Sequence, residues 1–387
     1  KITPVPGARG VADTAVSADP TVRVAAQSPA GDRFAGSLPQ SRYPARRWPI
    51  LGIAVVAVGI TIGGVAAFRP KPRPSEPPIV VQYEPPPKLS EQPAGQIQQF
   101  IGHTEAIEKV AFTPDGKRLV TASKDKTVRV WDIATGRELR TLIGHTGIVR
   151  GLTVLPDNRR AATAGWDGTV RLWDLDTGEE LRQYPGHKGQ VWWVECDAAG
   201  RRLLTAGQDG TIRLWDVNAG TAIKVMGKHF GTATAAVFLA DGKRAVSAGE
   251  DGNVFLWDLT TGDRIGRTRA PKMVYRLSLC PEGRWVLFGS DHWFLRWDPD
   301  GKLHPTRVPD VTDSIETVVG LPDGRLILAV VDGTIRLWQT KPERELHQFS
   351  ANGQAVLSLA VAPDGKHFAS AGRDKVARLW AIPTLSR

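Results

Sequence analysis

Residues 96–387 alternate short apolar runs with polar turns, a pattern typical of closely spaced β-strands. The first unit begins with an apolar-rich run at residues 107–112, which ends in the turn Thr-Pro-Asp-Gly. Two further runs follow at residues 118–123 and 127–132, and a fourth ends near Leu142. Turns rich in Pro, Asp and Gly separate the runs, as in antiparallel hairpins. Each unit is therefore predicted to be a small four-stranded sheet.

This unit recurs through the rest of the chain. A tryptophan marks the third run of every unit, at spacings of 40 to 42 residues: Trp131, Trp173, Trp215, Trp257, Trp297, Trp338 and Trp380. An aspartate stands six residues before each tryptophan: Asp125, Asp167, Asp209, Asp251, Asp291, Asp332 and Asp374. A period of about 40–45 residues with this pattern points to the blades of a β-propeller, which bury their apolar faces against neighbouring blades.

The two ends of the repeated region complement each other. The last unit ends after its third run, at residues 376–380, and lacks a fourth run. Residues 96–100 precede the first Gly-His pair, just as the fourth run of the first unit precedes the second pair. They can supply the missing strand, which closes the ring and protects an exposed sheet edge. The sequence therefore predicts an all-β fold, a seven-bladed β-propeller over residues 96–387.

A different hydrophobic pattern lies at residues 50–68, which form a run of 19 residues without a charge. At 1.5 Å per residue, a helix of that length nearly crosses the ~30 Å apolar core of a bilayer. Trp48 and several arginines flank the run, as at a membrane interface. We expect residues 48–69 to form one transmembrane helix, so that the chain is a single-pass membrane protein.

Two other interpretations of this run stay open. Residues 65–67 resemble a signal-peptide cleavage site, although at least 49 residues precede the run and its length exceeds the usual signal core. The run could also be a buried helix, although no neighbouring domain is there to cover it. Three basic residues on each side leave the membrane orientation undetermined: Arg42, Arg46 and Arg47 before the run, and Arg69, Lys71 and Arg73 after it.

The segments around this run show no hydrophobic period. Residues 1–47 are rich in Ala, Pro, Ser, Gly and Arg, a composition typical of a disordered tail. Residues 70–95 form a linker with nine prolines, a composition that favours a semi-rigid extended spacer. A ligand for a proline-reading domain is the other interpretation of this stretch.

Charge and cysteine content narrow the function classes. The formal net charge of +10 is spread as +5 over residues 1–95 and +5 over residues 96–387, with acids and bases interleaved. We therefore do not expect nucleic-acid binding, which uses a basic face or stripe. Cys196 and Cys280 lie 84 residues apart without a CxxC spacing, which indicates neither a disulfide framework nor a zinc site. No P-loop, HExxH, nucleophile-elbow or kinase signature is present, so we expect no cofactor and no enzyme within this chain.

The repeated units resemble WD40 repeats. Gly-His opens the first three units at residues 102–103, 144–145 and 186–187, and one inserted residue splits it in the fourth, at residues 227–229. Trp-Asp closes the first five units. The resemblance covers about three quarters of the chain. It implies a seven-bladed propeller that serves as a rigid platform for binding other proteins.

Four units share a set of His, Thr or Ser, Asp and Trp at the same offsets, which could be taken for a nucleophilic triad. An active site is normally built once, whereas this set occurs four times in register. The resemblance implies that these side chains hydrogen-bond one another and tie the strands of a blade together. The sets are His103, Thr121, Asp125 and Trp131; His145, Thr163, Asp167 and Trp173; His187, Thr205, Asp209 and Trp215; and His229, Ser247, Asp251 and Trp257. The last three units lack the His, and Leu287 and Leu328 replace the hydroxyl, so we expect weaker ties there and an irregular fifth unit.

The resemblance also implies a binding face, formed by the loop into the first strand and the turn between the second and third strands. The turn positions are Lys124, Trp166, Gln208, Glu250 and Arg373, and the positions near the first strand are Arg150, Gln190, Trp192, Met273 and Tyr275. Exposed Trp, Tyr, Met and Arg are typical of an interface hot spot. We expect a protein or peptide partner here, and expect Trp193 to pack between blades.

Three functional hypotheses follow. The first is a membrane-anchored protein-interaction scaffold. In the second, the chain is the C-terminal sensor part of a larger membrane enzyme. It lacks an initiator Met, and its arrangement of tail, membrane helix and propeller resembles that of bacterial receptor-type serine/threonine kinases, whose catalytic domain lies upstream. The propeller would then be extracytoplasmic, which is the side we favour. The third, a propeller that binds or hydrolyses a small molecule, is disfavoured because no non-repeated acid cluster occupies positions that face the central channel.

Overall fold

A computed structural model describes residues 95–308, 311, 313–351 and 353–384. The expected tail at residues 1–47, the transmembrane helix at 48–69 and all but the last residue of the linker at 70–95 lie outside these residues. Across the described ranges there is no helix long and apolar enough to span a membrane.

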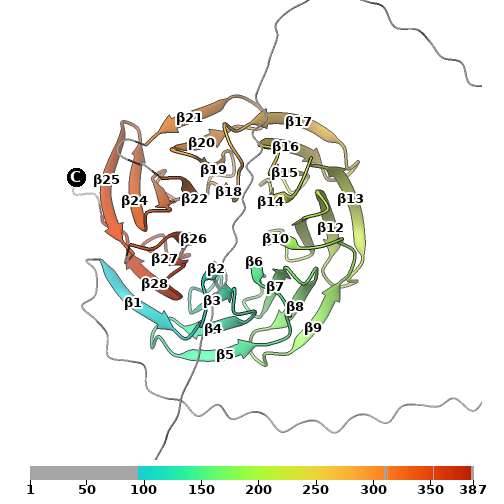
Figure 1. Cartoon of the computed structure of the whole chain (residues 1–387), viewed down its shortest axis with the longest axis horizontal. Coiled ribbons are helices and arrows are strands. Elements are labelled where there is room, and N and C mark those ends of the chain that lie inside the picture. The colour runs from blue at the N-terminus through green and yellow to red at the C-terminus, as the bar shows by residue number, and fades with distance from the viewer. Residues whose placement is uncertain (1–94, 309–310, 312, 352, 385–387) are drawn as a thin grey trace, which may run out of the picture. The chain divides into compact units, whose positions relative to one another are not determined.

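The described chain forms seven four-stranded antiparallel sheets arranged as blades around a common centre (Figure 1). Blades 1 to 4 contain β2 (Ile107–Phe112), β3 (Arg118–Ser123), β4 (Val128–Asp132), β5 (Glu138–Leu142); β6 (Val149–Val154), β7 (Arg160–Gly165), β8 (Val170–Asp174), β9 (Glu180–Tyr184); β10 (Val191–Cys196), β11 (Arg202–Gly207), β12 (Thr211–Asp216), β13 (Ala222–Lys228); and β14 (Ala233–Phe238), β15 (Arg244–Gly249), β16 (Asn253–Asp258), β17 (Arg264–Arg269). Blades 5 to 7 contain β18 (Ser278–Leu279), β19 (Val286–Ser290), β20 (Trp293–Trp297), β21 (Leu303–Arg307); β22 (Ile315–Gly320), β23 (Leu326–Val330), β24 (Thr334–Thr340), β25 (Glu343–Ser350); and β26 (Val356–Val361), β27 (His367–Gly372), β28 (Val376–Ala381), β1 (Gln96–Ile101). The first strand of each blade is innermost and the fourth is outermost (Figure 1). The prediction of an all-β, seven-bladed propeller is confirmed.

The ring closes through blade 7, where the first strand of the fold pairs with the last. Strand β1 lies antiparallel to β28, with Phe100 opposite Ala377 and Ile101 opposite Val376. The Phe100 side chain is fully buried, and its ring centroid lies 5.9 Å from that of Trp131 in blade 1. The predicted use of residues 96–100 as the missing outer strand is confirmed, and it leaves no open sheet edge at the junction of the two ends.

The hydrophobic core lies mainly between neighbouring blades. Innermost and second strands contribute Val, Leu, Ala and Phe side chains, while the repeated tryptophans fill the outer part of each junction. Trp131, Trp173, Trp215 and Trp380 are at most 2% exposed. A blade has two apolar faces and covers neither alone, so this packing explains why the repeat is stable only as a ring.

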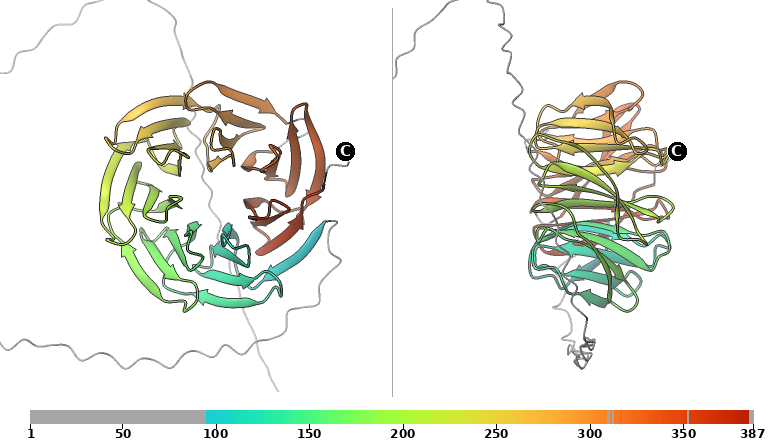
Figure 2. Two further views of the ribbon diagram at one scale, coloured as in Figure 1. Left: turned by 180° about the vertical axis from the view of Figure 1, so that it is seen from behind. Right: turned by 90° about the vertical axis from the view of Figure 1, so that its right-hand side faces the viewer.

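The ring has two distinct faces, which Figure 2 shows from the side. We call top face the one where the innermost strands begin and where the second strand turns into the third. Backbone hydrogen bonds join these two loops, for example from Lys124 N–H to the Ala106 carbonyl at 2.9 Å and from Trp166 N–H to the Ile148 carbonyl at 2.8 Å. The turns between the first and second strands lie on the opposite, bottom face.

Six of the seven innermost strands carry a β-bulge near the top face, where one extra residue interrupts the pairing. A bulge bends its strand and re-aims one side chain. Blade 5 is the exception, because its innermost strand has only two residues and Asp291 adopts a φ of 58°. The predicted irregularity of the fifth unit is confirmed.

Candidate functional site

Four blades contain a chain of hydrogen bonds that runs from Asp to Trp. In blade 1, the two ring nitrogens of His103 lie 2.7 Å from an Asp125 oxygen and 2.7 Å from Thr121 Oγ1. Trp131 Nε1 donates to the same hydroxyl at 2.9 Å. The same chain recurs in blades 2, 3 and 4 through His145, Thr163, Asp167 and Trp173; His187, Thr205, Asp209 and Trp215; and His229, Ser247, Asp251 and Trp257.

The charge states within these tetrads follow from their burial. Burial lowers the pKa of His103, as it does for His187 and His229, so each imidazole is neutral near pH 7. Burial acts to raise the pKa of Asp125, but hydrogen bonds from His103 and Thr127 hold it well below its usual value. The carboxylate only accepts, so His103 Nδ1 carries the proton and Thr121 donates to Nε2. The hydroxyl is 0% exposed, so the tetrad ties strands together and presents no open nucleophile.

The later blades are tied less. In blade 7, Trp380 Nε1 donates to Ser370 Oγ at 2.8 Å, without a histidine. In blade 6, where Leu328 replaces the hydroxyl, Trp338 Nε1 is buried without a hydrogen-bond partner among the described residues. Weaker ties were expected in the last three blades, and blades 6 and 7 show them.

The residues at the bulge position form a ring of side chains around the centre of the top face. In blades 1, 2, 3, 4, 6 and 7 they are Glu108, Arg150, Trp192, Thr234, Glu316 and Leu357, and the residue in the same register of blade 5 is Arg276. Successive members are 40 to 42 residues apart in the chain. Their chemistry differs from blade to blade, unlike that of the tetrads, so this ring is where the chain acquires an individual surface.

An ion-pair network crosses the centre of this ring. Arg150 Nη1 lies 2.9 Å from a Glu108 carboxylate oxygen, and Lys124 Nζ lies 3.4 Å from the other. Arg276 reaches from blade 5 to blade 1, where its Nη2 donates to the Glu108 carbonyl at 2.8 Å and lies 3.6 Å from the carboxylate. Burial lowers the pKa of Arg276 to about 10. Glu108 and Arg276 are 2% and 3% exposed, so the network is a buried strut between distant blades.

A contact between a lysine and a tryptophan joins the innermost strands of blades 1 and 3. Lys109 Nζ lies 4.1 Å from the ring centroid of Trp193, two blades away, and the intervening position in blade 2 is Gly151, which has no side chain. Burial lowers the pKa of Lys109 to about 7 and raises that of Glu195 to about 7. Single acids do lie on the innermost strands: Glu108 is in ion pairs with Lys124, Arg150 and Arg276, and the charge of Lys109 acts on Glu195.

The aromatic pair of Trp166 and Trp192 lies beside the network. Their rings stack with centroids 5.7 Å apart, and the Arg150 guanidinium carbon lies 4.4 Å from the Trp192 centroid. Trp192 Nε1 donates to Gln190 Oε1 at 3.2 Å, and Gln208 Oε1 accepts from Gln190 N–H at 3.1 Å. Half of the ten residues expected on the binding face therefore gather over blades 2 and 3.

The other expected residues lie around this centre. Tyr275 is half-buried; burial raises its pKa, and the charges of Glu316, Arg150 and Glu250 act on it. Met273 is half-buried between β17 and β18, and Glu250 and Arg373 are exposed in the turns of blades 4 and 7. Lys124 joins the group through Glu108. Trp193 is buried at 4% exposure and packs with blade 4 residues.

Sequence reasoning missed three residues of the top face. Glu108 lies 42 residues before Arg150, and Arg276 lies 84 residues, or two repeats, after Trp192. Both could have been found by following the repeat register from those two residues. Phe230 is 91% exposed and directly follows the tetrad histidine of blade 4. An exposed phenylalanine in the loop that enters blade 4 adds an apolar side chain to the top face.

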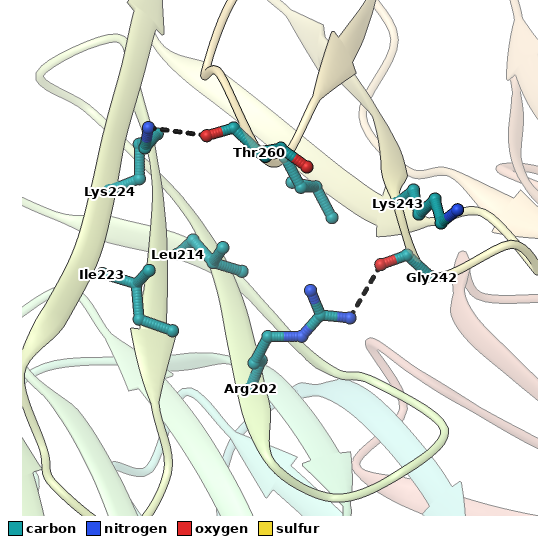
Figure 3. A pocket seen from close by; sticks show the side chains of 8 residues that line it. Arg202, Leu214, Ile223, Lys224, Gly242, Lys243 and Thr260 are labelled. Atoms are coloured by element: carbon teal, nitrogen blue, oxygen red, sulfur yellow. Dashed lines mark hydrogen bonds between the residues drawn. The ribbon is translucent and has the colours of Figure 1, made fainter.

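The structure also contains a hollow of about 520 Å³ on the rim between blades 3 and 4, lined by Leu214, Ile223 and several basic residues (Figure 3). Lys224 Nζ donates to the Thr260 carbonyl and Arg202 Nη2 to the Gly242 carbonyl, both at 2.8 Å. These donors are satisfied by the neighbouring blade. These side chains therefore link two neighbouring blades and do not converge as polar groups on a ligand in the hollow.

No metal or disulfide centre competes with the top face. Both cysteines are free thiols, and within the described ranges no group of three or more His, Cys, Asp or Glu side chains could hold a metal ion. Burial raises the pKa of the Cys196 thiol to about 12, which keeps it protonated and unreactive.

Comparison with known proteins agrees with the repeat. The family model "WD domain, G-beta repeat" matches residues 95–132, 136–174, 178–216, 220–258 and 343–381, together half of the chain. The matched stretches leave out residues 259–342, which hold blade 5 and the first three strands of blade 6, the two blades without a tetrad hydroxyl. Ribosome biogenesis protein BOP1 homologs of Drosophila erecta and Drosophila melanogaster are each 43% identical over 53 residues, 13% of this chain and 7% of the relative. The chain belongs to the WD40 family, built from WD-domain G-beta repeats.

Proposed function

We propose that this WD-repeat propeller is a membrane-anchored scaffold that binds a protein or peptide through its top face. Propellers of this family are typically interaction scaffolds without catalytic activity. The observation that carries the proposal is the stacked pair Trp166 and Trp192 with Arg150 against it. Tryptophan and arginine are the residue types that contribute most binding energy at protein interfaces.

The rigid support of this pair favours the same conclusion. Arg150 is held by Glu108, which Arg276 in turn holds from across the ring. Side chains fixed before binding lose little conformational entropy when a partner arrives. The half-buried indoles thus offer a preorganised apolar surface next to a fixed positive charge.

A position-specific crosslink tests which face binds. A photo-reactive amino acid at Gln208, exposed beside the tryptophans, should capture a partner in cells of the native source. The same amino acid at Lys117, exposed on the bottom face of blade 1, is the control and should not capture that partner. Capture of the same protein from Lys117 but not from Gln208 would overturn the top-face assignment.

The membrane anchor rests on the uncharged run at residues 50–68 and on the Pro-rich linker that follows it. The full chain should stay with the membrane pellet after carbonate extraction, because a spanning helix resists removal of peripheral contacts. Release into the supernatant would refute the anchor and leave the binding face untouched. An upstream reading frame that encodes a kinase domain would make the same propeller the sensor of that enzyme.

The resemblance to ribosome biogenesis proteins supports the shared repeat rather than a shared process. The 53 matched residues are little more than one repeat of 42 residues. Function resides in sites, and the top-face residues of one blade do not define a partner.

A further inference from the structure

Two lysines on the top face hold a backbone conformation that favours glycine. Lys126 in blade 1 has a φ of 73°, and Lys375 in blade 7 has a φ of 68°. Both directly follow the repeated Asp that precedes the third strand. Four other blades place a glycine there, with φ between 71° and 87°: Gly168, Gly210, Gly252 and Gly333. Lysine is strained in this conformation, and such strain is concentrated at functional sites.

The two other non-glycine residues with positive φ in the described ranges are of a different kind. They are Asn158 and Asp291, whose short polar side chains tolerate the left-handed region through local hydrogen bonds. Lysine has no such local compensation. The two lysines therefore bring a cation to a turn position that four other blades fill with glycine.

Both strained lysines belong to turns with the same charge pattern. Residues 124–126 read Lys-Asp-Lys, and residues 373–375 read Arg-Asp-Lys. The central Asp is used within its blade, since Asp125 pairs with His103 and Asp374 with Arg378. The outward side chains of the two turns are thus all basic. No Lys or Arg flanks the corresponding Asp in the other five blades.

The two basic turns belong to blades 1 and 7, which are neighbours across the ring closure (Figure 1). Strand β2 packs on β26, where Val110 N–H donates to Ser358 Oγ at 3.2 Å. Lys375 Nζ lies 3.9 Å from a Glu105 oxygen in the loop leading into blade 1. Lys126 and Arg373 are exposed, and neither is in an ion pair with the part of the chain that the structure describes.

The carboxylates that contact these turns do not balance them. Glu108 is shared by Lys124, Arg150 and Arg276, and Glu105 lies against Lys375. Lys126 and Arg373 thus keep their charge free of any carboxylate of the described residues. Contacts continue from Lys124 through Glu108 and Arg150 to the aromatic pair of blades 2 and 3. The top face therefore has a basic side and an aromatic side joined without a break.

We propose that the partner segment is an acidic peptide, whose carboxylates lie on the basic turns of blades 1 and 7 while an apolar residue stacks on Trp166 and Trp192. This inference rests on the proposed function and names the chemistry of the partner. Exposed cations attract carboxylates at long range, and several together give a salt-dependent gain in association rate and affinity. Lys126 and Lys375 supply two of these cations.

The test uses the full chain in detergent and a set of fluorescent peptides, each with one Trp and two neighbouring Glu residues separated by one to six Gly-Ser spacer residues. At least one spacing should bind, and binding should weaken as salt rises. The double variant Lys126→Gly and Lys375→Gly should weaken it about tenfold, since each exposed charge pair contributes a few-fold. Glycine adopts these φ values without strain, so the variant should unfold at no lower urea concentration than the wild type.

The matched control removes two lysines from the same blades on the opposite face. Lys117 and Lys366 are exposed in the bottom turns of blades 1 and 7. The variant Lys117→Gln and Lys366→Gln has the same net charge as the glycine variant, and it should bind the peptides as the wild type does. Equal losses in the two variants would mean a nonspecific charge effect and would overturn the inference.

Further outcomes separate the inference from the proposed function. Equal binding of peptides with Gln in place of Glu, or insensitivity to Lys126 and Lys375, would overturn the acidic-peptide inference alone. Binding of phosphatidylglycerol vesicles through the same lysines, without peptide binding, would replace it with a membrane contact. Loss of the native partner on Trp166→Ala and Trp192→Ala, with no peptide bound, would keep the proposed function and reject this inference. Retention of that partner would reject the proposed function itself.

Discussion

The tetrad hydroxyl of blade 1 offers a sharp test of what holds a blade together. Replacing Thr121 by Val keeps the side-chain shape but removes the hydroxyl that bonds both His103 and Trp131. Those partners are 6% and 2% exposed, so water does not replace the lost contacts. The substitution therefore leaves two buried polar groups without partners.

The expected magnitude follows from those two groups. Each buried group left unsatisfied costs about 1–3 kcal/mol, so Thr121→Val should lower the free energy of unfolding by roughly 2–6 kcal/mol. Blade 6 shows how the loss can be moderated, because its Leu328 has no histidine facing it. Adding His103→Leu to Thr121→Val removes one orphaned group, and we expect the double variant to be less destabilised than the sum of the two single variants.

Urea unfolding of the full chain in detergent, followed by circular dichroism, measures the effect. Thr146→Val is the matched control, because Thr146 is exposed on the top face of blade 2 and its side chain is in no hydrogen bond within the described residues. The control should unfold at the wild-type urea concentration. A Thr121→Val midpoint within error of the control would refute the view that the tetrads tie the blades.

Three further predictions concern closure, the central strut and pH. Phe100→Ala should destabilise the ring by about 3–5 kcal/mol, since Phe100 is fully buried at the seam between blades 7 and 1; a wild-type melting temperature would contradict closure through β1. Arg276→Met should cost about 1–3 kcal/mol, because Glu108 loses one buried partner but keeps Arg150 and Lys124; the same change at exposed Arg373 should cost nothing measurable in a denaturant titration. The pKa of His103, His187 and His229 is lowered in the folded chain from the usual value of 6.5. At a pH near or below 6.5 these side chains therefore bind more protons in the unfolded chain than in the folded chain. Stability should therefore fall as pH drops from 7 to 5, and a midpoint that stays flat or rises over that range would count against buried neutral histidines.

The fold was predictable because the repeat is carried by local signals. Each turn has its own Pro, Asp or Gly, and the Asp and Trp positions keep register through all seven units. Even the closure was visible, since residues 96–100 match the outer run of the next blade. Blade 5 shows the limit: the sequence indicates an irregularity, but its innermost strand of two residues depends on packing that no local signal encodes.

The top face was only partly predictable. The turn residues can be found from the sequence, because each directly precedes the repeated Asp. Trp166 and Trp192 were both predicted to lie on the binding face, and their rings stack in the structure. The strut between Arg276 and Glu108 joins residues 168 apart, and such a contact depends on the diameter of the ring. The strain at Lys126 was also hidden, because a lysine in a turn reveals its φ only in the folded chain.

The most direct test of a partner-binding top face is quantitative capture from extracts of the native source on three full-length baits. They are the wild type, the double variant Trp166→Ala and Trp192→Ala, and Trp285→Ala, a bottom-face tryptophan that also has an arginine against its ring. We predict at least one protein that is enriched on the wild type and on Trp285→Ala but reduced about tenfold or more on the double variant, as for a hot-spot pair. The same enriched proteins at equal levels on all three baits would contradict binding through this face.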